Sequence, residues 1–191
     1  MIKLVTDSPC NPTSGLRVTS QDIWLTTLLF AALDAVIIVP LFILFKVNIF
    51  QVAWWSVVGG SALFWGVVSV VAAARFWDLY YRYIYPSWLR PLMPLDIVLY
   101  AIIGLVIWYL ALSRLVGTPP PLAFALLGGA QGIAEHLFGI YVLRILDKVP
   151  WLQGVPPLPV IVFSFFEYVL YWTLVLWLAL GLVKLGALVR G

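Results

Sequence analysis

Five long apolar runs constrain the fold of this chain more than any other feature of its sequence. A helix rises about 1.5 Å per residue, so crossing about 30 Å of hydrocarbon takes about 20 apolar residues, and each run reaches that length. The runs place membrane-spanning helices near residues 23–45, 52–74, 95–115, 122–145 and 158–182. A backbone inside lipid must satisfy its own hydrogen bonds, and no run alternates with period two. The sequence therefore predicts an all-α fold, a polytopic transmembrane bundle of five helices.

The composition agrees with a single integral membrane domain over residues 1–191. Charged side chains make up 10% of the residues and hydrophobic ones 64%, whereas about a quarter of the residues in a soluble domain are charged. Residues 1–22 are polar and lack the apolar core of a cleavable signal peptide, so we expect the first span itself to direct insertion. No linker or low-complexity tract divides the rest of the chain. The lipid bilayer is therefore the first partner that the sequence implies.

The basic residues are scattered in ones and twos at the ends of the apolar runs. Membrane proteins keep Lys and Arg at these positions, and the chain has no basic stripe of the kind that binds nucleic acid. No nucleic-acid partner is therefore expected. With five spans, more Lys and Arg fall on the side of the N-terminus than on the opposite side. The positive-inside rule then predicts a multi-pass protein of the cell membrane with a cytoplasmic N-terminus.

Three carboxyl side chains fall deep inside the predicted spans: Asp34, Glu135 and Glu167. Each lies about 9 to 11 residues from the predicted cytoplasmic end of its helix, which places all three about 14 to 17 Å deep, near the bilayer midplane. An ionised acid there costs about 2.5–3.5 kcal/mol, and no Lys or Arg lies deep enough to neutralise one. We expect protonated acids that share hydrogen bonds, a carboxylate paired with protonated His136, or carboxylates that hold an external cation.

Helical periodicity indicates where two of these acids point. Glu135 shares a helix face with three glycines, and such small residues let a neighbouring helix approach closely. These glycines are Gly128, Gly132 and Gly139. His136 lies about 100° around the helix and need not point the same way. Tyr171 follows Glu167 by one turn, so its hydroxyl can reach that carboxyl.

The predicted binding site comprises Asp34, Glu135, His136, Glu167 and Tyr171. A second interpretation stays open, in which each protonated acid is only a polar packing contact between helices. The chain has a single histidine, which excludes histidine-rich di-iron sites and bis-histidine haem unless an oligomer shares the site. Glu135 and His136 are adjacent, which does not fit the Glu-x-x-His pattern of ferritin-like sites. Neither a metal nor a cofactor is therefore expected, although a zinc site of His136, Glu135 and Glu167 is geometrically conceivable. A hydrolase that pairs Ser61 with His136 is disfavoured, because the two lie about 7 Å apart along the membrane normal.

The segment RFWDLYYRYIYPSWLRP, residues 75–91, combines aromatic rings with three arginines. Such a mixture is typical of the aromatic belt at a membrane surface. It is also suited to binding an anionic lipid headgroup through Arg75, Arg82 and Arg90. Asp78 and Arg82 are four residues apart and can pair if the helix continues through them. No D-x-x-D motif occurs in the chain, which argues against prenyl transfer.

These residues support two functions of different classes. The first is a midplane acidic site that binds a proton, a small cation or an amine, in transport or as a subunit of a membrane complex or homo-oligomer. The alternative is a membrane-embedded enzyme that acts on a hydrophobic small molecule, a lipid or isoprenoid, by carboxylic-acid general acid/base catalysis. A third possibility, a structural subunit, predicts no cavity beside the acids. An enclosed apolar pocket of about 300 Å³ or more favours an enzyme, and polar access to water favours a conduit.

Overall fold

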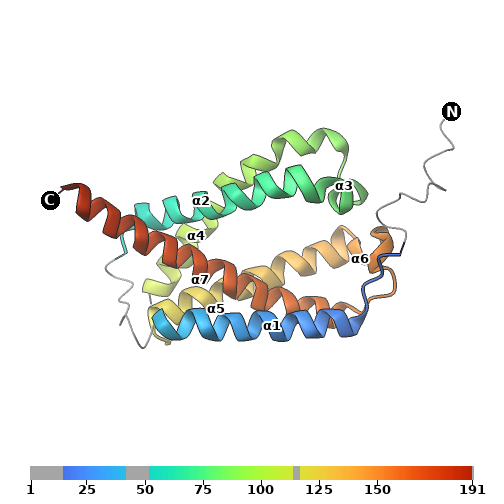
Figure 1. The fold of residues 1–191 in the computed structure, drawn as a ribbon, viewed down its shortest axis with the longest axis horizontal. Helices are drawn as coiled ribbons and strands as arrows, with labels where there is room; N and C mark the ends of the chain where they lie inside the picture. Colours follow the sequence, from blue (N-terminus) through green and yellow to red (C-terminus); the bar gives the residue numbers. More distant parts are fainter. Residues whose placement is uncertain (1–14, 42–51, 114–116, 191) are drawn as a thin grey trace.

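The computed structural model describes residues 15–41, 52–113 and 117–190 (Figure 1). Every regular element in these ranges is helical, which confirms the predicted all-α fold. Four helical stretches within them are long and apolar enough to cross a membrane: Ser20–Val39, Trp54–Leu79, Ser87–Leu112 and Pro157–Val189. They correspond to the first, second, third and fifth predicted spans. Residues 1–14 of the predicted polar segment, and the span ends predicted at 42–45 and 114–115, lie outside the described residues.

Local sequence signals explain how the first helices begin and change. Helix α1, Ser20–Val39, starts at a capping box. The Thr19 N–H donates to Asp22 Oδ2 over 2.8 Å, and the Asp22 N–H donates to Thr19 Oγ1 over 3.2 Å, so two backbone donors of the first turn are satisfied. Helix α2, Trp54–Val71, passes into a π-helical turn, Ala72–Phe76, and then into α3, Trp77–Leu79.

The third span has a composite start. Residues Ser87–Leu95 form a 3-10 helix that contains Pro91 and Pro94, and α4, Asp96–Leu112, follows it directly. A proline has no N–H to donate and clashes with the preceding turn of an α-helix. Regular α-helical geometry therefore begins just after Pro94, close to the predicted residue 95.

The fourth predicted span corresponds to α5, Pro120–Leu137, which continues through a π-helical turn, Phe138–Val142. It is not among the four most apolar stretches because Gln131, Glu135 and His136 make it more polar. Figure 1 shows α5 lying along the long axis of the molecule beside α1 and α7. That α5 crosses the membrane remains a prediction.

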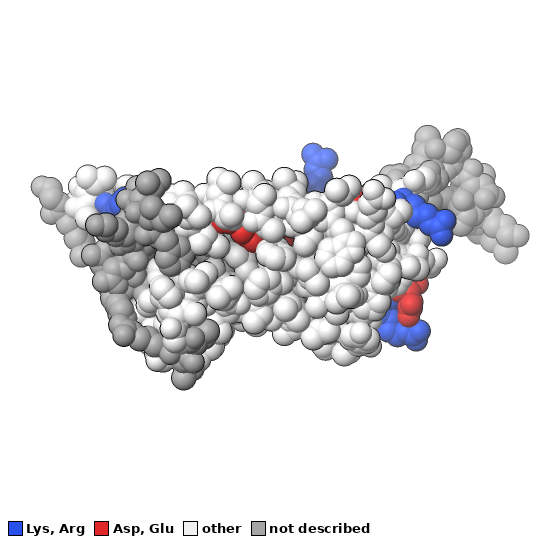
Figure 2. Space-filling model, turned by 90° about the horizontal axis from the view of Figure 1, so that it is seen from below, with Lys and Arg blue, Asp and Glu red and all other residues white. Residues whose placement is uncertain are grey.

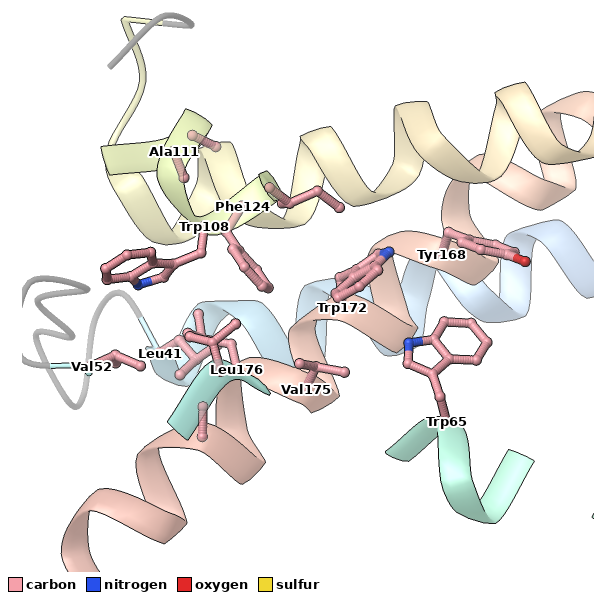
Figure 3. Packing of buried hydrophobic residues seen from close by; sticks show 14 residues of the cluster. Leu41, Val52, Trp65, Trp108, Ala111, Phe124, Tyr168, Trp172, Val175 and Leu176 are labelled. Atoms are coloured by element: carbon pink, nitrogen blue, oxygen red, sulfur yellow. The ribbon is translucent and has the colours of Figure 1, made fainter. Parts of the chain in front are cut away.

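The last helix, α7, Pro157–Arg190, holds the bundle together because it packs against α1, α2 and α5. Two of the glycines singled out in the sequence make its contact with α5 possible. A Cβ on Gly128 would lie 2.7 Å from Trp172 Cβ, and one on Gly132 would lie 2.6 Å from Tyr168 Cβ. Figure 3 shows Trp172 and Tyr168 of α7 facing Trp65 of α2 in the hydrophobic core.

The outer surface has the character expected of a protein that faces lipid. Large apolar side chains are exposed along α1, including Leu25, Leu28 and Val36. Figure 2 shows one face on which charged side chains lie mainly toward one end, while the broad middle is mostly uncharged, with a small acidic area and a basic side chain that projects at its upper edge. Exposing apolar side chains to water is unfavourable, whereas exposing them to hydrocarbon is not. This surface is therefore suited to the interior of a membrane.

Candidate functional site

A cavity of about 940 Å³ lies between the α2–α4 pair and the α5–α7 pair. The two pairs diverge toward the end of the molecule where α3 and α6, Ile145–Lys148, are found (Figure 1). Six tyrosines and two tryptophans line the cavity together with aliphatic side chains. Its ionisable lining besides the tyrosines consists of Asp96, Glu135, Glu167 and His136, and no Lys or Arg of the described chain is among the lining residues. The cavity is therefore aromatic and acidic.

Glu135 is the most densely hydrogen-bonded carboxyl in the cavity. Tyr100 Oη of α4 donates to its Oε2 over 2.7 Å, and Tyr168 Oη of α7 donates to the same oxygen. Gln131 Nε2, one turn earlier on α5, donates to Oε1. Glu135 is the acceptor in all three contacts, so three helices fix the position of this carboxyl.

The Gln131 amide is itself oriented by the core. Trp172 Nε1–H donates to Gln131 Oε1 over 2.9 Å, which leaves the amide NH₂ to face Glu135. Trp172 is fully buried and packs against Gly128. A chain of hydrogen bonds therefore runs from the rigid centre of α7, through Gln131, to Glu135.

Glu167 forms a second polar group in the same cavity. Tyr171 Oη donates to Glu167 Oε1 over 2.6 Å, as the one-turn spacing of the two residues predicts. His136 Nε2 lies 3.9 Å from Glu167 Oε2, and His136 Nδ1 lies 3.0 Å from the Gly132 carbonyl. A carbonyl only accepts, so Nδ1 carries the hydrogen. The histidine thus faces Glu167 rather than Glu135, its neighbour in the sequence.

The side chains of His136, Glu167 and Glu135 are accessible from the cavity. The side chains of His136 and Glu167 are 23% and 18% exposed, and Glu135 is half-buried. None of the three is sealed inside a tight helix contact. A molecule that enters the cavity can therefore touch them directly.

The structure does not place Asp34 at this cavity. Asp34 lies on α1, which packs against α7, and no residue of α1 lines the cavity. Its side chain is 5% exposed, and neither carboxyl oxygen has a hydrogen-bond partner among the described residues. Of the predicted set, the cavity brings together Glu135, His136, Glu167 and Tyr171.

Three residues of the site were missed by the sequence reasoning: Asp96, Tyr100 and Gln131. Each was visible as a one-turn pair. Gln131 precedes Glu135 by four residues, and Asp96 precedes Tyr100 by four residues, the same spacing as Glu167 and Tyr171. Polar side chains four residues apart on an apolar helix share one face. That face turns toward the cavity in α4, α5 and α7.

The three arginines of the interfacial segment have different environments. Arg75 is exposed on the π-helical turn that follows α2. Arg82 is exposed, with its guanidinium 4.9 Å from the Tyr83 ring centre and Nη2 donating to Tyr83 Oη over 2.8 Å. Arg90 is half-buried, and its Nε donates to the Ala73 carbonyl over 2.9 Å.

The ion pair anticipated between Asp78 and Arg82 is not formed. The helix that would place them on one face ends at Leu79, and a 3-10 turn, Tyr81–Tyr83, follows it. A break in α-helical geometry changes the direction of every later side chain. Arg82 therefore contacts Tyr83 instead.

The described residues contain no group of three or more His, Cys, Asp or Glu side chains that could hold a metal ion. Ser61 is buried against Gly104 of α4 and does not line the cavity that His136 lines. Comparison with protein-family models, with curated proteins and with solved structures gives no match to this chain. The chemistry of the cavity is therefore the basis for the function proposed next.

Proposed function

We propose that the cavity binds a hydrophobic organic molecule that carries a positive charge, with an amine as the simplest form, in a multi-pass protein of the cell membrane. In this proposal α5 is a fifth crossing and the N-terminus is cytoplasmic. The direction of α5 supports the crossing, because it lies along the same axis as α1 and α7 (Figure 1). The basic residues at the ends of the apolar runs support the orientation.

The size of the cavity favours an organic molecule over a bare proton or metal ion. Sites for small organic ligands usually have volumes of about 300–1,000 Å³, and 940 Å³ falls within this range. A metal ion needs several oxygen or nitrogen ligands within about 2.6 Å, which a wide aromatic cavity does not provide. The cavity also argues against a purely structural subunit, since tight helix packing would have filled it.

The single observation that carries the proposal is the charge of the lining. Three carboxyl groups line the cavity, and no described Lys or Arg lines it with them. A positive ligand offers these acids the partner that the chain does not supply, while an anionic ligand would be repelled. Aromatic faces add to the attraction, for example the Trp65 ring stacked on Tyr100 with centroids 3.7 Å apart.

A binding experiment with a matched pair of probes tests this proposal. The protein in lipid nanodiscs is titrated with octylamine and with octanol, with empty nanodiscs as the blank for partitioning. Octylamine is expected to bind through Glu135, and Glu135→Gln is expected to weaken it at least about tenfold because a charge-assisted contact is lost. Asp34→Asn, a buried acid away from the cavity, serves as the control and should leave affinity unchanged. Equal binding of both probes, or an unaffected Glu135→Gln variant, would refute the proposal.

A second candidate is supported by the different surroundings of the two glutamates. Glu135 accepts from three fixed donors, whereas Glu167 has one tyrosine and lies beside His136. Two carboxyls with different environments in one cavity are the usual arrangement of an acid and a base. Protonated Glu167 would add its proton to one carbon of a double bond, which leaves a positive charge on the other carbon of that bond. Glu135 would then remove a proton from a third carbon, attached to the charged one, so that the new double bond forms between these two. The net reaction is a shift of the double bond in an isoprenoid, with no change of oxidation state.

Deuterium incorporation distinguishes the enzyme from the binding protein. A membrane-soluble isoprenoid incubated with the protein in D₂O should gain deuterium at the protonated carbon if the enzyme hypothesis holds. Glu167→Gln should abolish this incorporation, and octylamine should inhibit it because an ammonium mimics the positive intermediate. If octylamine binds but no deuterium is incorporated, the binding function is supported and the catalytic function is excluded.

The exposed arginines suggest where the protein meets lipid headgroups. Arg75 and Arg82 are exposed and can contact phosphates at the membrane surface, although Arg82 also donates from Nη2 to Tyr83 Oη. Arg90 is half-buried, and its Nε donates to the Ala73 carbonyl. Headgroup binding by Arg75 and Arg82 is part of the proposal.

A further inference from the structure

The third carboxyl of the cavity differs from the other two in its contacts. Asp96 is the first residue of α4, lines the cavity and is half-buried. Glu135 and Glu167 each accept hydrogen bonds from tyrosines. The Asp96 carboxyl has no hydrogen bond or ion pair with any residue that the structure describes. Its acceptor capacity is therefore available to a molecule in the cavity.

Aromatic rings from the segment after α2 line the same cavity as Asp96. Trp77, Tyr81 and Tyr85 form a row, with centroids 6.2 Å apart for the first pair and 6.0 Å for the second, and all three line the cavity. Tyr80 meets Tyr81 edge-on at 5.1 Å. A carboxylate beside several aromatic faces is the arrangement that recognises alkylammonium groups.

The charge of Asp96 contributes to the raised pKa values of two of these tyrosines. Burial raises the pKa of Tyr81 to about 12, with the charges of Tyr85 and Asp96 as further causes. The pKa of Tyr85 is also raised, by burial first and by Asp96 second. Both phenols therefore stay neutral at physiological pH and present their ring faces and hydroxyl groups to a cation without competing for it.

Asp96 and Glu135 line the same cavity from two different helices. Asp96 precedes Tyr100 by four residues on α4, which is a rise of about 6 Å, and the Tyr100 hydroxyl reaches on to Glu135 of α5. The aromatic row comes from the segment after α2, at the end where α3 lies. Asp96 and Glu135 are thus two separate carboxyls, on α4 and α5, that line one cavity.

We propose that Asp96, Trp77, Tyr81 and Tyr85 form a second ammonium subsite, so that the cavity takes a diamine with a hydrophobic chain between two ammonium groups. This inference rests on the proposed function, in which Glu135 binds the first ammonium group. One ammonium binds at Glu135 and the other at Asp96. The aliphatic and aromatic lining between them covers the hydrocarbon chain.

A chain-length series tests the two-subsite arrangement. Unbranched α,ω-diaminoalkanes of increasing length are compared with octylamine for binding to the protein in nanodiscs. Affinity should pass through a maximum at the length that spans both subsites, and the best diamine should bind at least about tenfold more tightly than octylamine. A flat series, or diamines no tighter than the monoamine, overturns the inference.

Substitutions at Asp96 assign the second subsite to this residue. Asp96→Asn should reduce the affinity for the best diamine to about that of octylamine, and it should weaken octylamine binding far less than Glu135→Gln does. Asp96→Glu keeps the charge on a longer side chain, so it should keep the preference for diamines and move the optimum to a shorter chain. Asp78→Asn removes an exposed acid near the same end that does not line the cavity, and it should have no effect. An Asp96→Asn variant that keeps the diamine preference overturns the assignment.

The outcomes separate this inference from the function on which it rests. If octylamine fails to bind, or binds independently of Glu135, the proposed function fails. If octylamine binds through Glu135 and no diamine is favoured, only the second subsite fails. Asp96 also lies in the first turn of α4, where a negative charge stabilises a helix. If Asp96 only stabilises the helix, the Asp96→Asn variant should have a lower thermal midpoint. The way in which affinity depends on diamine length should then be the same as in the unchanged protein.

Discussion

Trp172 of α7 holds Gln131 of α5 by a 2.9 Å hydrogen bond from its indole N–H to the amide oxygen. The other end of the amide donates to Glu135. An amide held at one end cannot rotate without breaking a buried hydrogen bond, which costs about 1 kcal/mol or more. The ligand-facing carboxyl is therefore positioned by a residue that never touches the cavity, since Trp172 is not among its lining residues.

The first prediction removes this hydrogen bond and keeps the aromatic ring. Trp172→Phe should leave the fold intact and weaken octylamine binding several-fold. It should lower the free energy of unfolding by about 1–3 kcal/mol, because Gln131 Oε1 loses a buried donor and the smaller ring packs less well. Trp108→Phe is the matched control, because Trp108 is buried but its Nε1 has no hydrogen-bond partner among the described residues. Thermal unfolding and probe titration measure both effects. Equal binding by the two variants would contradict a positioning role for Trp172.

The second prediction concerns the glycine face of α5. Gly128→Ala would place a Cβ in overlap with the Trp172 ring and 2.7 Å from Trp172 Cβ. Because neither atom group can move away freely in a packed core, we expect a loss of at least about 1–3 kcal/mol in the free energy of unfolding. Gly181→Ala is the control, since a Cβ there meets no atom within 4 Å. That variant should be neutral or gain up to about 1 kcal/mol from helix propensity. Thermal midpoints in detergent compare the two, and a tolerated Gly128→Ala would show that α5 and α7 are not packed as described.

The third prediction concerns the buried carboxyl outside the cavity. Asp34→Leu should raise the thermal midpoint, because it removes two buried oxygens that have no partner among the described residues and whose desolvation costs about 1–3 kcal/mol. Thr27→Val on the same helix is the comparison, because its buried hydroxyl is satisfied by the Ile23 carbonyl at 2.8 Å. It should change stability little. A destabilised Asp34→Leu variant would mean that another molecule supplies the missing partner.

The fourth prediction concerns alkaline pH. The pKa of Tyr81 is raised to about 12, mainly by burial, and an unfolded tyrosine titrates near 10. As the pH rises above about 10 the unfolded chain loses this proton before the folded one does, so the contribution of Tyr81 to stability is complete below pH 10 and declines toward pH 12. Thermal midpoints between pH 8 and 12 should fall less steeply in Tyr81→Phe than in the unchanged protein. Identical slopes would show that Tyr81 is not buried.

Sequence alone predicted the elements of this fold because hydrophobic length and proline position are local properties. For this reason α4 begins at Asp96 and α7 begins at Pro157, close to the predicted starts at residues 95 and 158. The face of a helix is also local, so Glu135 was expected on the same face as Gly128 and Gly132. The structure turns its carboxyl into the cavity, where Tyr168 of α7 donates to it, rather than into a closed helix contact. The four-residue spacing likewise predicted the Tyr171 hydrogen bond to Glu167.

The partners across helices could not be obtained in this way. Periodicity places Asp34, Glu135 and Glu167 at similar depth, but depth does not say which helices are neighbours around the bundle. Because α1 packs against α7 but contributes no residue to the cavity lining, Asp34 is separated from the other two acids. His136 faces Glu167 for the same reason, since α7 and not its own helix supplies the nearest carboxyl.

Tyr100 links α4 to both helices on the other side of the cavity, because its hydroxyl donates to Glu135 on α5 and lies 3.4 Å from the Tyr168 hydroxyl on α7. A ligand that draws Glu135 away from this phenol therefore also breaks a hydrogen bond between α4 and α5. Ligand binding and the loss of this contact are then thermodynamically coupled. A change that strengthens the hydrogen bond between Tyr100 and Glu135 must weaken ligand binding by the same free energy.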